Sequence, residues 1–126
     1  MKWKNKGHEI DNFALEICNI FDQKKGVIVY GAGNVGTRIY RALKRYDLFH
    51  KFVDNDAQKQ KSGYMGEQVV GSDQIIDGGY LLVVAVAGAY KQVSEQLQKI
   101  GLEEDKDFVK DNIQLLVEKG VYPKQL

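Results

Sequence analysis

The chain contains 126 residues, of which 44% are hydrophobic and 28% charged, and its formal net charge is +1. These values are typical of one soluble domain, and so small a net charge argues against a sequence-independent nucleic-acid surface. The single cysteine, Cys18, cannot form an internal disulfide, and the longest apolar run, residues 80–87, is too short to cross a membrane. We therefore expect a cytoplasmic protein that partners neither nucleic acid nor a membrane.

Apolar residues near the N-terminus recur at helical spacing. Ile10, Phe13 and Ile17 fall on one stripe, which predicts an amphipathic helix. Gly26 is a suitable residue to end this helix. We expect the helix, within residues 1–26, to pack on the edge of a sheet or on a partner chain.

The most informative segment is residues 27–36, where an apolar strand leads directly into the motif Gly-x-Gly-x-x-Gly. In nucleotide-binding α/β domains the first glycine, here Gly31, makes a tight turn. The second, Gly33, lets the backbone approach a pyrophosphate, and the third, Gly36, lets the following helix pack on the sheet. That helix directs its unpaired N–H groups and the positive end of its dipole at the anion. Apolar residues follow at helical spacing, as this arrangement requires: Val35, Ile39, Ala42, Leu43 and Tyr46.

A second strand is predicted over residues 51–53, and it ends at an acidic residue, Asp54. This carboxylate follows Gly31 at close to the roughly 20-residue distance at which such domains place the residue that binds a ribose hydroxyl. A carboxylate there disfavours a 2′-phosphate, which favours NAD or another nucleotide with free ribose hydroxyls over NADP. The alternative is a solvated Asp54 at a strand end, beside glycines that serve only helix–sheet packing.

The segment 55–63 is too rich in Lys, Gln and Asp to join the core. Asn55 directly follows Asp54 and is expected to belong to the same site. Lys59 and Lys61 flank the mouth of the predicted crevice, where they either contact a phosphate or remain solvated.

The second half of the core continues the alternation of strands and helices. Val69 and Val70 predict a short third strand, followed by one helical turn around residues 73–76. The apolar run 81–87 predicts an interior parallel strand that is covered on both faces. Ala87 and Gly88 come next, either at the rim of the ligand crevice or simply in a turn.

The remaining elements complete the predicted fold. A helix over residues 90–100 has Val93, Leu97 and Ile100 inward, and residues 107–109 form a last strand. We expect a single Rossmann-like α/β domain of three layers with a mostly parallel sheet of four to five strands. Its core spans residues 27–109, and residues 110–126 add a C-terminal helix and tail.

Several other residue patterns do not predict a catalytic or metal site. Tyr40 and Lys44 match a Tyr-x-x-x-Lys string, but they lie on the helix behind the glycine loop, and Tyr40 is expected on the helix surface. His8, Glu9 and His50 lack further ligands at metal-binding spacing. With no nucleophile–base pair either, we expect a binding domain rather than an enzyme with complete catalytic machinery.

Residues 27–109 resemble a Rossmann-like domain of bacterial surface-glycan biosynthesis. The segment is similar to the N-terminal domain of sialic-acid O-acyltransferase-like sugar acetyltransferases. It is also similar to a domain that precedes the catalytic part of polysaccharide-biosynthesis nucleoside-diphosphate-sugar epimerase/dehydratase proteins. The residues that carry the resemblance are the glycine motif, Phe52 to Asp56 with Lys59, Gly66 before Val69 and Val70, and residues 99–109. The hexapeptide repeats and catalytic domain of those proteins are not found in this sequence.

The resemblance implies a crevice for a nucleotide, NAD or another dinucleotide, or a nucleotide-sugar. The leading hypothesis is a ligand-binding module that serves a larger glycan-biosynthesis enzyme or a homodimer. The alternatives are a small NAD-dependent oxidoreductase or epimerase completed by dimerisation, and a regulatory nucleotide-sensing domain. The predicted ligand-binding residues are Gly31, Ala32, Gly33, Asn34, Val35, Gly36, Asp54, Asn55, Lys59, Ala87 and Gly88.

Overall fold

The computed structural model describes residues 23–45, 47–74 and 79–111. The predicted N-terminal helix, the C-terminal helix and tail, and part of the turn around residues 73–76 lie outside the described residues. The core that carries the glycine motif lies within them.

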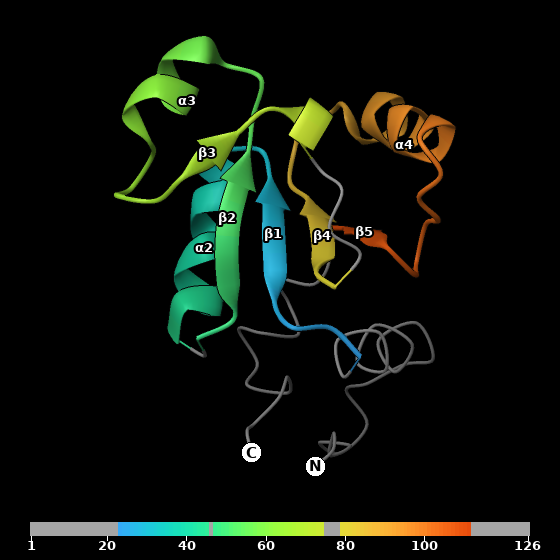
Figure 1. Cartoon of the computed structure of the whole chain (residues 1–126), viewed down its shortest axis with the longest axis horizontal. Coiled ribbons are helices and arrows are strands. Elements are labelled where there is room, and N and C mark those ends of the chain that lie inside the picture. The colour runs from blue at the N-terminus through green and yellow to red at the C-terminus, as the bar shows by residue number, and fades with distance from the viewer. Residues whose placement is uncertain (1–22, 46, 75–78, 112–126) are drawn as a thin grey trace.

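Five parallel strands form one sheet in the order β3-β2-β1-β4-β5 (Figure 1). This confirms the predicted Rossmann-like α/β fold. The strands are β1 (Val27–Tyr30), β2 (Phe49–Val53), β3 (Val69–Val70), β4 (Leu81–Val84) and β5 (Phe108–Lys110).

Helices cover both faces of this sheet, as expected for three layers. Helix α2 (Asn34–Arg45) packs on one face and α4 (Tyr90–Lys99) on the other. A short helix, α3 (Ala57–Ser62), lies beyond the carboxyl end of β2, and a 3₁₀ turn, η1 (Ser72–Gln74), follows β3.

The alternation of side chains along β1 divides the core between these two faces. Val27 and Val29 join the cluster that contains Ile39 of α2. Ile28 lies on the opposite face in the cluster that contains Leu97 of α4. Every residue of β1 and β4 is buried, which explains why both strands read as continuous apolar runs.

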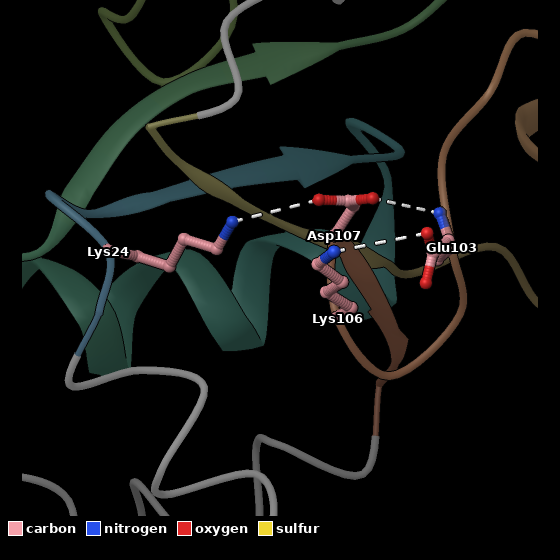
Figure 2. A network of polar contacts seen from close by, with 4 residues as sticks. All are labelled: Lys24, Glu103, Lys106 and Asp107. Carbon is pink, nitrogen blue, oxygen red and sulfur yellow. Dashed lines mark hydrogen bonds and ion pairs between the residues drawn. The ribbon is translucent and has the colours of Figure 1, made fainter.

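Polar contacts join β1 and β5 at the amino ends of these strands (Figure 2). Lys24, just before β1, lies 3.8 Å from the carboxylate of Asp107, just before β5. The other oxygen of Asp107 accepts a hydrogen bond from the backbone N–H of Glu103 at 2.9 Å, and Lys106 pairs with Glu103 at 3.9 Å. These contacts order the turn that leads into the edge strand.

The structure corrects the prediction that Tyr40 lies on the helix surface. Strand β2 begins at Phe49, two residues earlier than predicted, and this brings the Phe49 ring 4.7 Å from the Tyr40 ring. Phe52 lies 5.3 Å from Tyr40 on the same side. Only 8% of Tyr40 is therefore exposed.

The prediction of an inward Ile100 is also wrong. Helix α4 ends at Lys99, and Ile100 leaves the helical conformation as its C-cap with 59% of its surface exposed. The chain then reverses through Gly101, whose φ of +98° favours glycine. Leu102 packs against the core instead, and its N–H donates to the carbonyl of Leu97.

Candidate nucleotide site at the glycine loop

The strand order creates a topological switch point between β1 and β4. The chain leaves β1 through α2 toward β2, and it leaves β4 through α4 toward β5, on the other side of the sheet. The two loops diverge from adjacent strand ends, which the bond from Ala85 N–H to the carbonyl of Tyr30 holds together at 2.8 Å. Open α/β sheets bind ligands at this position.

Two glycines of the motif are required by the fold itself. Gly31 has a φ of +118°, and a Cβ there would come within 2.5 Å of the carbonyl oxygen of Ala85. A Cβ at Gly36 would overlap the carbonyl oxygen of Gly31 and touch Val29. The first glycine thus makes the turn, and the third lets α2 approach β1, as predicted.

Gly33 is glycine for neither of these reasons. Its φ lies outside the left-handed region, and a Cβ placed on it would meet no atom within 4 Å. The backbone at the second glycine therefore borders open space. A residue without a side chain at such a point permits close approach of a ligand.

Four backbone N–H groups at this point have no hydrogen-bond partner among the described residues. They belong to Gly33, Asn34, Val35 and Gly36, the first turn of α2 and the residue before it. The last turn of α2 carries Lys44 and Arg45, and the first turn has no acidic residue. Unpaired N–H groups and the helix dipole together favour an anion at this end of α2.

Asp54 lies against the glycine loop. One carboxylate oxygen accepts a hydrogen bond from the N–H of Ala32 at 2.9 Å, and the other accepts from the N–H of Asp56 at 2.9 Å. The strand-end acid thus links the loop after β1 to the start of α3. Asn55 points elsewhere: its side-chain oxygen accepts from the N–H of Ser72 at 2.9 Å.

The two candidate lysines of α3 differ. The ammonium of Lys59 donates to the carbonyl oxygen of Ala32 at 2.5 Å and lies 5.1 Å from the centre of the Tyr64 ring. Lys61 is exposed and makes no hydrogen bond or ion pair with another described residue. The structure therefore brings Lys59, but not Lys61, to the loop.

Ala87 and Gly88 form an exposed turn after β4. Gly88 has a φ of +72° with open space around it, so its glycine serves the turn. The start of the same loop contacts the motif, since Val86 would lie 3.2 Å from a Cβ at Gly31. The turn at Ala87 and Gly88 thus comes directly after Val86, the residue of this loop that borders the glycine motif.

Sequence reasoning missed two residues beside the motif, Thr37 and Tyr64. The Thr37 hydroxyl donates to the carbonyl of Gly33 at 2.7 Å, a bond that a threonine four residues into a helix often makes. Tyr64 then reaches the Thr37 hydroxyl at 2.8 Å from the turn after α3. Nothing in the local sequence indicates this second contact.

Both residues of the Tyr-x-x-x-Lys string, Tyr40 and Lys44, contact the side chain of Glu67. Tyr40 and Lys44 both donate to one carboxylate oxygen of Glu67 at 2.8 Å. Burial, reinforced by the Glu67 carboxylate, raises the pKa of Tyr40, and the hydrogen bond from Lys44 lowers the pKa of Glu67. Glu67 thus engages both the phenol and the ammonium, and ties α2 to the turn before β3.

After the loop that follows β4, Tyr90 begins α4, and its hydroxyl donates to Glu104. Burial, with this bond, raises the pKa of Tyr90.

Within residues 23–45, 47–74 and 79–111 no group of His, Cys, Asp and Glu side chains is arranged to hold a metal ion. The helices in that part of the chain are all too short or too polar to cross a membrane.

Residues 23–108 match the family model described as C2185-like, N-terminal. The chain belongs to the C2185-like family. The match to the C2185-like N-terminal domain begins just before β1 and runs to the first residue of β5, so it includes the glycine loop, Asp54 and Lys59. Neither the curated proteins nor the solved structures contain a significant match to the chain. The resemblance to sugar acetyltransferases and epimerases stays a prediction.

Proposed function

We propose that this C2185-like domain binds a nucleotide, a dinucleotide such as NAD, or a nucleotide-sugar, with a phosphate at the N-terminus of α2. One observation carries the proposal. Gly33 has no left-handed φ, and a Cβ on it would have no neighbour within 4 Å, yet it stands between two glycines that the fold requires. Space for an anion beside unpaired N–H groups accounts for a glycine at this position.

Asp54 supports a ligand that carries a ribose. A carboxylate has about four acceptor positions, and the N–H groups of Ala32 and Asp56 occupy two of them. Asp54 therefore keeps acceptor capacity beside the loop for a ribose hydroxyl. Its negative charge disfavours a 2′-phosphate, which favours NAD or a nucleotide-sugar over NADP.

The biological setting that we propose rests on the resemblance seen in the sequence. Similarity to domains of sugar acetyltransferases and sugar-nucleotide epimerases supports a role in bacterial surface-polysaccharide metabolism. The domain would present the bound ligand to a larger enzyme or to a second copy of the chain. A binding module of this kind supplies recognition, and its partner supplies the chemistry.

A thermal-shift panel of matched ligands tests the proposal. It compares NAD, NADP, UDP-glucose, UDP and ADP with the nucleosides uridine and adenosine, which lack phosphate. A ligand at one hundred times its Kd adds about 2.7 kcal/mol, which raises Tm on the order of 10 °C for a domain of this size. We expect stabilisation by at least one phosphate-containing ligand and none by its nucleoside. Equal stabilisation by a nucleoside and its phosphate, or none by any ligand, would contradict the proposal.

A further inference from the structure

Two successive peptide groups at the start of α2 are held through their carbonyl oxygens. Lys59 donates to the carbonyl of Ala32 at 2.5 Å. The carbonyl of Gly33 accepts from both the hydroxyl and the N–H of Thr37, at 2.7 and 2.8 Å. The C=O and N–H of a planar trans peptide point in opposite directions. Holding these two carbonyls therefore directs the N–H groups of Gly33 and Asn34 away from Lys59 and Thr37.

The groups that hold the carbonyls are linked through Tyr64. Thr37 has one hydroxyl proton, which it donates to Gly33, so in the 2.8 Å contact with Thr37 the hydroxyl of Tyr64 is the donor. The Tyr64 ring lies 5.1 Å from the Lys59 ammonium and packs edge-on against the buried ring of Phe52 at 5.4 Å. Packing against Phe52 thus fixes the Tyr64 ring, and Tyr64 contacts both the Thr37 hydroxyl and the Lys59 ammonium.

The preceding peptide group, between Gly31 and Ala32, is held through its N–H rather than through its carbonyl. Asp54 accepts from the N–H of Ala32 at 2.9 Å, so Ala32 is bonded on its N–H by Asp54 and on its carbonyl by Lys59. The backbone between Ala32 and Asn34 is therefore constrained by side chains from beyond β2, which lie outside the glycine motif. A peptide flip in this segment would break one of these bonds.

We propose that Lys59, Tyr64 and Thr37 are positioning residues, which orient the N–H groups of Gly33 and Asn34 toward the phosphate without contacting the phosphate themselves. This inference rests on the proposed function. It reassigns Lys59, because an ammonium on the carbonyl side of the Ala32–Gly33 peptide lies opposite the Gly33 N–H. The lysine acts on the ligand through the backbone.

Amide NMR spectra of the ligand-free protein test the positioning directly. The variants are K59M, which removes the ammonium, and Y64F, which removes one hydroxyl but keeps the ring. K61M and Y80F make the same chemical changes at positions that do not contact the loop. We expect the Gly33 and Asn34 amide signals to move in K59M and Y64F and to stay in place in K61M and Y80F. Unmoved signals in K59M and Y64F would overturn the inference.

Binding measurements with the best ligand of the panel, either NAD or UDP-glucose, complete the test. We expect K59M and Y64F to weaken binding roughly three- to tenfold, the effect of one lost hydrogen bond, and K59R to restore most of the affinity. Y64F is decisive, since it changes no charge. A large loss in K59M with no loss in Y64F would show that Lys59 contacts the phosphate directly, which overturns the inference. If the wild type binds no panel ligand while the amide signals still move, the proposed function fails and the backbone orientation stands.

Discussion

The carboxylate of Asp54 bonds the N–H of Ala32 at 2.9 Å, which joins the end of β2 to the glycine loop after β1. The acidic residue that the motif predicts for ribose recognition therefore also shapes the loop. Its second oxygen bonds the N–H of Asp56, whose own side chain caps α3 through Gln58 and Lys59. One residue thus connects the glycine loop, β2 and the helix that carries Lys59.

This double role predicts a stability effect at Asp54. D54A leaves the N–H groups of Ala32 and Asp56 without their acceptor, and should lower the free energy of unfolding by about 1–3 kcal/mol. D54N keeps a side-chain oxygen and should lose less. Urea denaturation of both variants measures the difference, with D73A at an exposed residue as the control. Wild-type stability in D54A would show that the carboxylate does not hold the loop.

The three glycines of the motif should respond differently to alanine. G36A forces a methyl group onto the carbonyl of Gly31 and should destabilise the fold by about 1–3 kcal/mol or more. G33A meets open space and has no left-handed φ to lose, so it should cost no more than about 1 kcal/mol, the preference of this position before α2 for glycine over alanine. Thermal and urea unfolding distinguish the two. Equal destabilisation by both would contradict the different reasons assigned to these glycines.

Glu67 should make stability depend on acid pH. The hydrogen bond from Lys44, together with that from Tyr40, lowers the pKa of Glu67 below its ordinary value of 4.5 in the fold. The ionised carboxylate therefore stabilises the protein above pH 4.5. This contribution decreases as pH falls from there through the lowered folded pKa.

E67Q removes this titration. Urea midpoints measured between pH 7 and pH 3 should fall less steeply for E67Q than for the wild type, and E67Q should be the less stable of the two at pH 7. E95Q, at an exposed residue of α4, is the control. Parallel curves for wild type and E67Q would mean that Glu67 has the same pKa in the folded and unfolded states.

The C-terminal end of α4 gives a test of packing. L97A should cost about 2–5 kcal/mol, because Leu97 is buried in the cluster beneath α4. I100S should change stability by no more than about 0.5 kcal/mol, because Ile100 is the exposed C-cap. Chemical denaturation of both variants checks this. A cost for I100S similar to that for L97A would show that Ile100 packs inward, as helical spacing predicts.

The sequence predicts the backbone of this fold well, because hydrophobic spacing and glycines act over short distances. The run before Gly31, the helical spacing after it and the apolar run of β4 all correspond to observed elements. Elements defined by side-chain capping were harder to predict. Helix α3 has no buried residue, and it is held by the Asp56 cap, which a polar stretch of sequence does not reveal.

The candidate site likewise has residues that the sequence identifies and residues that it does not. The motif identifies Gly31, Gly33 and Gly36, and the strand end identifies Asp54. The contacts of Lys59 and Tyr64 with the loop depend on how the segment after β2 folds back over α2, a tertiary relationship across 27 positions in each case. Spacing alone carries no signal for such contacts, so the sequence does not indicate Tyr64 and leaves open whether Lys59 contacts a phosphate or remains solvated.

The affinity of the G33V variant for the best ligand of the panel tests the central claim most directly. Isothermal titration would compare wild type, G33V and A57V, the last of which adds bulk at an exposed residue of α3. We predict that G33V unfolds within about 1 kcal/mol of the wild type, the cost of valine at this position before α2. It should nevertheless bind at least about one hundredfold more weakly, while A57V binds normally. Wild-type affinity in a folded G33V would contradict a phosphate at the N-terminus of α2.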